Sequence, residues 1–185
     1  MTRDQAYNLL TKYLTNKVLV KHSLAAEATM RTLANYFGED EEIWGMTGLL
    51  HDADYELSRG NPKKHGKLLF EKEKDLDLPD EIIHAIKAHN YQHNKIKPES
   101  KMDWAMACCD ELTGLIVAET FLLPSRKLKD VKVEFLMKRL KQKDFEKEAD
   151  RANLFLCDKE LKIPLIEFVT MTLTAMQNVH EALEL

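Results

Sequence analysis

The sequence has few cysteines and no long apolar run, the features that are typical of secreted and membrane-spanning proteins. Its 185 residues include three cysteines, an odd number, of which two are neighbours on a predicted helix where they cannot easily pair. This favours a reduced, cytoplasmic compartment. No apolar stretch approaches the roughly 18 residues that a membrane span needs, and the first residues form no apolar signal core. We therefore expect no membrane association.

An excess of positive charge is also absent. The chain has 27 Lys and Arg against 31 Asp and Glu, which gives a net charge of -4. No basic stripe interleaved with aromatic residues is present. Nucleic acid is therefore not the expected partner.

Signals for β-strands are scarce, whereas helical periodicity of the apolar residues is nearly continuous. The pattern predicts an all-α fold without repeats or flexible linkers, and Pro79, Pro164 and Gly38 mark helix ends. The predicted helices span residues 4–14, 17–37, 40–50, 63–74, 79–90, 102–120, 131–140, 144–156 and 163–183.

The most informative motif is the pair His51-Asp52, which closes the run Gly48-Leu49-Leu50-His51-Asp52. Imidazole nitrogens and carboxylate oxygens are good ligands for divalent metals. Consecutive helical residues point about 100° apart, so both can reach one ion only from a helix end or a distorted turn, and an apolar run ends here at Leu50. His22 lies before the pair. Asp110 follows in an apolar helix, where a buried carboxylate needs a cation or several donors.

This order of residues resembles the HD-domain superfamily of metal-dependent phosphohydrolases. The resemblance covers about 17–123 and implies an HD-domain helical bundle, with a C-terminal helical extension at about 124–185 in a single domain of 1–185. It implies one or two divalent ions (Mn, Fe, Co, Ni, Zn or Mg). In members with two metals, one aspartate bridges both ions, and the resemblance implies this role for Asp52. The metal ligands implied are His22, His51, Asp52, His65, His89 and Asp110.

The substrate is less clear from the resemblance. The extended ligand order is similar to bacterial HD hydrolases that cleave diadenosine tetraphosphate, but Tyr55 stands where many relatives have a phosphate-holding lysine. The run Leu49–Glu56, together with Asp110–Val117, looks more like a group of small predicted HD hydrolases of bacteria and archaea.

We therefore expect hydrolysis of a phosphoester or phosphoanhydride bond in a nucleotide or another small phosphorylated metabolite by metal-activated water. Asp52 and Asp54 are the candidate catalytic residues, and Asp54 would either support a ligand or act as a general base. The candidate substrate contacts are Lys21, His93, Arg126 and Lys127, with the segment 126–132 favoured as a loop that folds over the site.

Two other interpretations of the function stay open. The chain could be a non-catalytic sensor that binds metal or nucleotide, or a diiron oxygenase on the same scaffold; phosphate release with Mn or Co would separate the hydrolase from both. His84 is expected to be structural or to support a metal ligand, and His180 to lie on the surface. His93 could replace His89 as a ligand. The last helix is apolar on more than one face, which suits either burial in a monomer or a homodimer contact.

Overall fold

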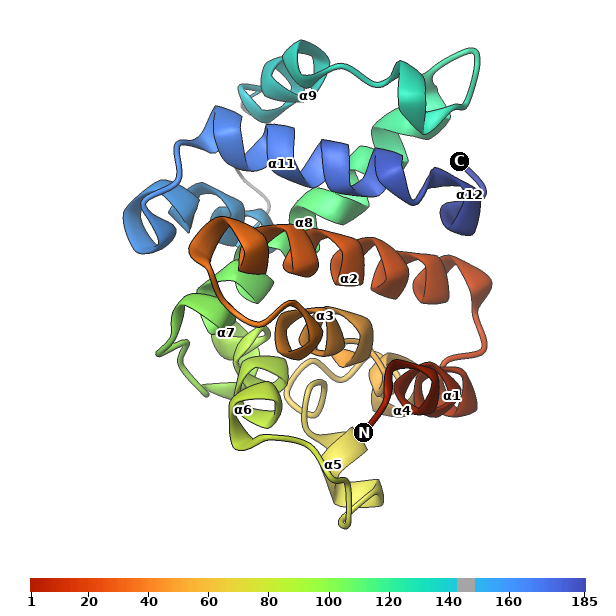
Figure 1. The fold of residues 1–185 in the computed structure, drawn as a ribbon, viewed down its shortest axis with the longest axis vertical. Coiled ribbons are helices and arrows are strands. Elements are labelled where there is room, and N and C mark those ends of the chain that lie inside the picture. The colour runs from red at the N-terminus through yellow and green to blue at the C-terminus, as the bar shows by residue number, and fades with distance from the viewer. Residues whose placement is uncertain (143–148) are drawn as a thin grey trace.

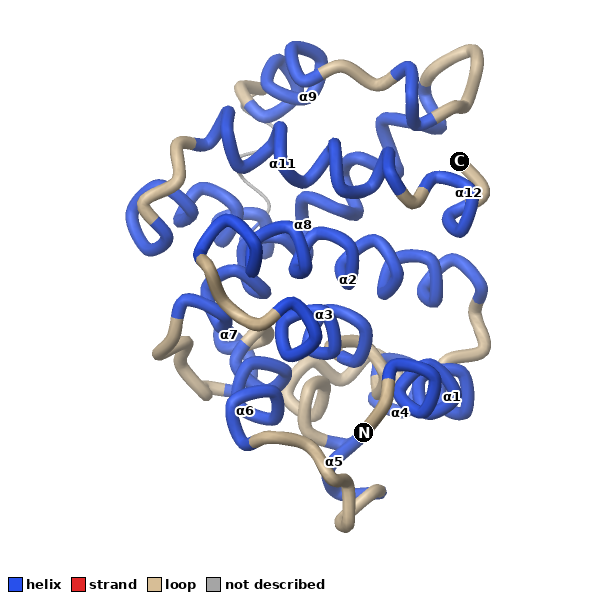
Figure 2. The backbone as a smooth tube through the Cα atoms, in the orientation of Figure 1, coloured by secondary structure: helices blue, strands red, loops and turns tan. Residues whose placement is uncertain are grey.

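The computed structural model describes residues 1–142 and 149–185, and the regular structure within these ranges is helical without any β-strand (Figures 1 and 2). This confirms the predicted all-α class. The longer helices are α1 (Arg3–Tyr13), α2 (Lys17–Phe37), α3 (Glu41–Leu50), α6 (Asp80–Ala88), α8 (Lys101–Leu122), α9 (Val133–Leu140) and α11 (Leu165–Asn178). The short ones are α4 (Tyr55–Ser58), α5 (Leu68–Lys72), α7 (Tyr91–Asn94), η1 (Leu128–Asp130), η2 (Ala149–Leu156), η3 (Cys157–Leu161) and α12 (His180–Leu183).

The two long central helices end at residues that suit helix termini. Asn16 caps α2 by accepting a hydrogen bond from the Val18 N–H, and Gly38 ends it with a left-handed φ of 69°. Helix α8 begins with a reciprocal capping box between Ser100 and Asp103. These caps fix the axial position of both helices, and each of them carries a candidate metal ligand.

Three predicted helices differ from the structure. The helix expected at 63–74 is reduced to α5, because Gly66 takes a φ of +81° that a helix does not allow. The last helix is divided at Val179, whose φ of -113° separates α11 from α12. Of the helix expected at 144–156, residues 144–148 lie outside the described part, and 149–156 form the 3-10 segment η2.

The helices pack around two apolar clusters on either side of α2 (Figure 1). The larger cluster joins α2, α8 and α11 through buried residues such as Met30, Met106 and Phe168. The smaller joins α1, α3 and α6 through residues such as Leu10 and Leu49. Helices α2, α3, α6 and α8 therefore converge near the middle of the molecule, where the candidate metal ligands lie.

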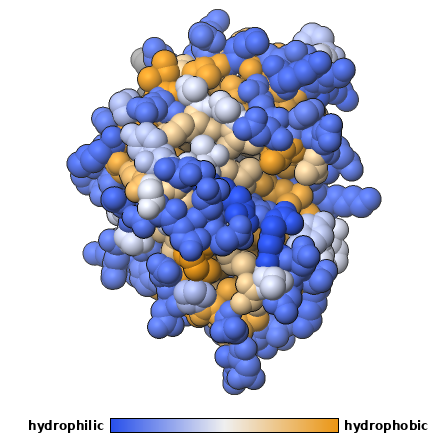
Figure 3. Space-filling view, viewed as in Figure 1, coloured by the Kyte–Doolittle hydropathy of each residue, from blue (hydrophilic) through white to orange (hydrophobic). Residues whose placement is uncertain are grey.

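The C-terminal helix α11 packs against α2, α8 and α9. It buries Phe168, Val169 and Met176 within the chain, while Ile166 is exposed. In the space-filling view, hydrophobic side chains show between hydrophilic ones around α9 and α11 (Figure 3). No helix among the described residues is long and apolar enough to cross a membrane.

Candidate metal centre

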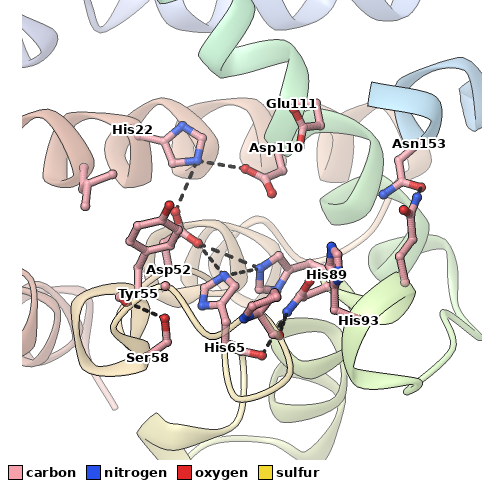
Figure 4. A pocket seen from close by; sticks show the side chains of 15 residues that line it. His22, Asp52, Tyr55, Ser58, His65, His89, His93, Asp110, Glu111 and Asn153 are labelled. Atoms are coloured by element: carbon pink, nitrogen blue, oxygen red, sulfur yellow. Dashed lines mark hydrogen bonds and ion pairs between the residues drawn. The ribbon is translucent and has the colours of Figure 1, made fainter. Parts of the chain in front are cut away.

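The six predicted metal ligands come from separate parts of the sequence and meet at the junction of four helices. Figure 4 shows five of them, without His51. One lies on α2, two follow the end of α3, one lies in the turn before α5, one follows α6 and one lies on α8: His22, His51, Asp52, His65, His89 and Asp110. Gly48 allows α3 to approach α2 closely, because a Cβ at this position would lie 2.6 Å from the carbonyl oxygen of Ala26. We refer to the six side chains as the metal cluster.

The first half of the metal cluster joins His22, His51, Asp52 and Asp110. The Nε2 atom of His22 lies 2.9 Å from Oδ1 of Asp110 and 3.6 Å from Oδ2 of Asp52. His51, which is fully buried, places its Nε2 3.2 Å from that of His22 and 3.4 Å from Oδ1 of Asp110. The expectation that adjacent residues reach one site from a helix end agrees with this geometry, since α3 ends at Leu50.

The second half shares Asp52 with the first. Oδ1 of Asp52 lies 3.0 Å from Nε2 of His65 and 3.9 Å from Nε2 of His89. The two histidine Nε2 atoms are 3.0 Å apart. Potential ligand atoms of His22, His51 and Asp52, and likewise of Asp52, His65 and His89, lie within 4.8 Å of one another. Asp52 therefore belongs to two possible metal sites.

Hydrogen bonds of the opposite ring nitrogens orient all four imidazoles. Nδ1 of His51 faces the Gly48 carbonyl at 2.8 Å, and Nδ1 of His89 faces the Ile86 carbonyl at 2.5 Å. Nδ1 of His22 donates to the Thr113 hydroxyl oxygen at 3.2 Å, because that hydroxyl donates its own proton to the Asp110 carbonyl. With Nδ1 acting as the donor, the lone pair of Nε2 is left for the cluster, as is usual for metal-binding histidines.

Asp54 holds the fourth imidazole and does not face the cavity. It is 1% exposed, and its Oδ1 accepts hydrogen bonds from Nδ1 of His65 at 2.7 Å and from the Gly66 N–H at 3.0 Å. Its Oδ2 accepts from the N–H groups of Leu68 and Leu69. Of its two expected roles, the geometry favours support of a ligand over general base, because every acceptor position is directed into the fold.

Burial and the nearby carboxylates act in opposite directions on these histidines. Burial lowers the pKa of His51, but the carboxylates of Asp52 and Asp110 raise it more, to about 9. Burial also lowers the pKa of His65, whereas hydrogen bonds to Asp52 and Asp54 raise it to about 10. For His89, burial and the two charged imidazoles beside it lower the pKa to about 4. Without a cation, the carboxylates thus hold protons on two of the imidazoles.

The carboxylates themselves stay ionised. Burial raises the pKa of Asp52, but the charges of His51 and His65 outweigh it and keep this pKa well below its usual range. Burial likewise raises the pKa of Asp110, but its hydrogen bonds with His22 and His51 outweigh this effect. The pKa of Asp110 therefore also lies well below its usual range.

The donor set fits a divalent cation. Imidazole nitrogens only 3.0 and 3.2 Å apart repel one another unless a proton or a cation lies between them. Four imidazoles with two carboxylates suit Mn, Fe, Co, Ni or Zn better than they suit an ion that prefers oxygen ligands alone.

The metal cluster opens into a cavity of about 400 Å³, large enough for a small molecule. Tyr55 forms one wall, with its ring edge-on to that of His65 at 5.3 Å between centroids. The other lining residues that are not metal ligands are Leu19, Ser58, Gly60, Pro62, Asn90, Gln92, His93, Glu111 and Asn153.

Of the predicted substrate contacts, only His93 lines this cavity. Lys21 is directed away and forms an ion pair with Glu184 at 2.6 Å. Arg126 and Lys127 follow the end of α8, about 18 Å along the helix from Asp110 at 1.5 Å per residue. The expectation that segment 126–132 covers the site is corrected accordingly: none of its residues lines the cavity, because the long helix α8 separates it from Asp110.

The remaining histidines lie as expected. His84 pairs with Asp103 at 2.9 Å, outside the metal cluster, and His180 is exposed. His89, and not His93, joins the second half of the cluster.

Sequence reasoning missed the polar residues that line the cavity beside the metal ligands. Glu111 adjoins Asp110 in sequence, which could have indicated it. Gln92 and Asn153 carried no signal, because nothing in the sequence shows that residues so far apart meet.

Comparison with known proteins agrees with this centre. A family model described as the HD domain matches residues 19–118, more than half of the chain. The chain belongs to the HD domain family. It is thereby a member of a superfamily of metal-dependent phosphohydrolases, and its histidine and aspartate groups fit a metal site.

A curated relative is more distant. Ribonuclease Y of Rhodopirellula baltica is 32% identical over 104 residues, which are 54% of this chain and 18% of that protein. The chain therefore spans less than a fifth of the length of this relative. No solved structure matches the chain.

Proposed function

We propose that this HD-domain chain is a phosphohydrolase that cleaves a phosphoester or phosphoanhydride bond of a nucleotide or another small phosphorylated metabolite. The observation that carries the proposal is the position of Asp52. Its Oδ1 faces His65 at 3.0 Å and its Oδ2 faces His22 at 3.6 Å, so one carboxylate serves two neighbouring groups of ligands beside an open cavity. Such an arrangement suits two cations that act on one phosphoryl group.

The metal cluster supports this reaction through its fixed geometry. When bound, divalent cations polarise phosphoryl oxygens and lower the pKa of water so that it attacks at neutral pH. His22, His51 and Asp110 would hold one cation and His65 and His89 the other. Their Nδ1 hydrogen bonds keep the ligands in place before the substrate arrives, which avoids a cost of reorganisation during the reaction.

The cavity suits a substrate whose charge is met mainly by the cations. Within the described part of the chain, no lysine or arginine lines it. The phosphate is therefore expected to bind at the metal cluster, while Tyr55, Gln92, Asn153 and other neutral groups surround the organic part of the substrate. Nucleotides satisfy this division because their bases and riboses are neutral and polar.

The relative named Ribonuclease Y favours a second candidate, a phosphodiester bond in RNA. The net charge of -4 argues against binding long nucleic acid, so a short oligonucleotide or an RNA end is the form to test.

The test combines metal content with phosphate release. Wild-type protein, Asp52→Asn and the matched control Asp77→Asn, whose carboxylate is fully exposed, are loaded with Mn, Co, Ni, Fe, Zn or Mg. Each is assayed on nucleoside mono-, di- and triphosphates, diadenosine tetraphosphate, a short RNA and phenyl phosphate. We expect turnover with at least one metal, a loss of at least about a hundredfold in Asp52→Asn, and none in the control.

The other outcomes separate the alternatives. Metal bound without turnover of any substrate would contradict the proposal and favour the sensor or, if iron gives a diiron spectrum, the oxygenase. Failure to bind any metal after reconstitution would remove the basis of the proposal.

A further inference from the structure

Asn153 reaches the cavity from a part of the chain that the HD domain match does not include. That match ends at residue 118, whereas Asn153 lies on η2 in the C-terminal part. It is nevertheless one of the residues that line the cavity with the metal cluster (Figure 4). The C-terminal part therefore completes the cavity wall as well as the apolar core.

Three contacts hold Asn153 in one orientation. Its side-chain Oδ1 accepts hydrogen bonds from the Tyr91 hydroxyl at 2.9 Å and from Nε2 of Gln92 at 2.8 Å. Its backbone carbonyl lies 3.2 Å from the thiol of Cys108 on α8. Burial raises the pKa of Cys108 well above its usual range, so this thiol keeps the proton it donates. The next residue, Leu154, is fully buried and anchors the segment in the main core.

With its oxygen engaged, Asn153 presents its amide nitrogen to the cavity. The residue is only 7% exposed, and Nδ2 makes no hydrogen bond to another described residue. Figure 4 shows the nitrogen on the side that faces Asp110 and Glu111, whereas the oxygen bonds to Gln92. The fully buried side-chain atoms without a hydrogen-bond partner lie elsewhere in the described chain, at Ser23, Arg139 and Thr172, so Nδ2 of Asn153 is accessible from the cavity, where a ligand can accept its hydrogen bond.

We infer that Asn153 recognises the organic part of the substrate, by donating a hydrogen bond to an oxygen or ring nitrogen of a nucleoside. This deepens, and rests on, the proposed function. The phosphate is taken by the metal cluster, so a neutral donor on another wall of the cavity meets a neutral acceptor. Because Asn153 is held before binding, little conformational entropy is lost when the substrate arrives. A substrate without an acceptor at this point leaves the donor unpaired and binds more weakly.

The experiment compares nucleotides with a substrate that lacks the acceptor. Mn-loaded wild type, Asn153→Ala and Asn153→Asp are measured with the four common nucleoside monophosphates and with phenyl phosphate. Asn153→Asp keeps an acceptor for Tyr91 and Gln92 but removes the donor. The matched control is Gln177→Ala, which removes a partly buried amide that bonds to the Leu128 carbonyl away from the cavity. Affinity is read as KM where turnover occurs and as calorimetric Kd where it does not.

In wild type, at least one nucleotide should bind about tenfold more tightly than phenyl phosphate, and both Asn153 variants should lose about that factor for it. Phenyl phosphate should change by less than about twofold in Asn153→Ala, which adds no charge to the cavity, and Gln177→Ala should resemble wild type. Tyr91→Phe, which removes only one of the contacts that orient Asn153, should give a smaller loss of nucleotide affinity.

Three results would overturn the inference: nucleotide affinity unchanged in both Asn153 variants, an equal loss for phenyl phosphate, or no preference for any nucleotide in wild type. The equal loss would indicate a purely structural role. Turnover that does not depend on Asn153 would leave the proposed function intact, whereas nucleotide binding that depends on Asn153 without any turnover would contradict the proposed function alone.

Discussion

The substitution Asp54→Asn tests whether the metal cluster is held by the hydrogen bonds behind it. Asp54 accepts four hydrogen bonds, two at each carboxylate oxygen, from Nδ1 of His65 and from three backbone N–H groups. Asparagine has nearly the same shape but offers only one acceptor oxygen. Whichever way its amide is turned, an NH2 group faces two donors. The ring of His65 or the turn before α5 must then shift.

The expected magnitude follows from these contacts. Each buried donor that loses its acceptor costs about 1–3 kcal/mol, so the loss of two gives about 3 kcal/mol of unfolding free energy. For a chain of this size, that corresponds to a fall of about 6–12 °C in Tm. Loss of a group that orients a metal-binding histidine lowers metal affinity by about 10- to 100-fold. Only the half of the cluster that contains His65 and His89 should be weakened.

The assay pairs thermal unfolding of the metal-free protein with calorimetric titration of Mn or Co. The chain offers a matched control in Asp103, which is also 1% exposed and accepts hydrogen bonds from two backbone N–H groups and from Nδ1 of His84. Asp103→Asn should leave metal affinity unchanged, since His84 lies outside the metal cluster. Its Tm should fall less than that of Asp54→Asn, because all three donors meet Oδ2 alone and the amide oxygen of asparagine can replace it.

A single outcome would refute the reasoning about Asp54. If Asp54→Asn lowers Tm but binds both metal equivalents as tightly as wild type, the carboxylate stabilises the turn without positioning His65. Equal losses of metal affinity in Asp54→Asn and Asp103→Asn would also refute it, because the effect would then reflect general destabilisation.

Three further predictions follow from the same geometry. Gly48→Ala should cost about 1–3 kcal/mol and weaken metal binding, because its Cβ would meet the Ala26 carbonyl; denaturation and titration would show it, and an unchanged metal affinity would contradict it. Metal binding should release protons, because the pKa values of about 9 for His51 and about 10 for His65 lie above neutrality in the metal-free protein. Metal affinity should therefore fall as the pH falls from 9 towards 7, by up to about tenfold per pH unit for each proton displaced. Calorimetry in buffers of different ionisation enthalpy would count the released protons. Lys21→Ala should change KM by less than about twofold because Lys21 pairs with Glu184, and a large rise in KM would restore it as a substrate contact.

The all-α class and the candidates His22, His51, Asp52 and Asp110 could be inferred from the sequence for a physical reason, whereas His65 and His89 were implied by the resemblance to HD-domain proteins. Helical periodicity extends over most of the chain, and His51-Asp52 stands at a helix end. A carboxylate such as Asp110 on an apolar helix requires compensation wherever that helix packs. These arguments depend on residue type and local position, which the sequence contains.

The parts that the sequence did not predict depend on distant contacts. The helix expected at 63–74 has acceptable local propensity, but the hydrogen bonds of Asp54 to Gly66 and Leu68 fold the first half into a turn. The basic segment after α8 looked like a phosphate site because it follows the Asp110 helix in sequence. Its distance from Asp110 depends on the length and straightness of α8, which local patterns determine poorly.

The metal ligands and the other cavity residues also lie in different parts of the chain. The metal cluster lies wholly within the region that matches the HD domain, so its sequence pattern indicates the type of chemistry. Gln92 and Asn153, which line the remainder of the cavity, meet only because η2 packs against α7 and α8. A substrate is distinguished by what surrounds its organic part, and here that wall is assembled partly from outside the matched region. The metal-dependent chemistry that we propose is therefore indicated by the motif, whereas the proposed selectivity depends on residues of the C-terminal part.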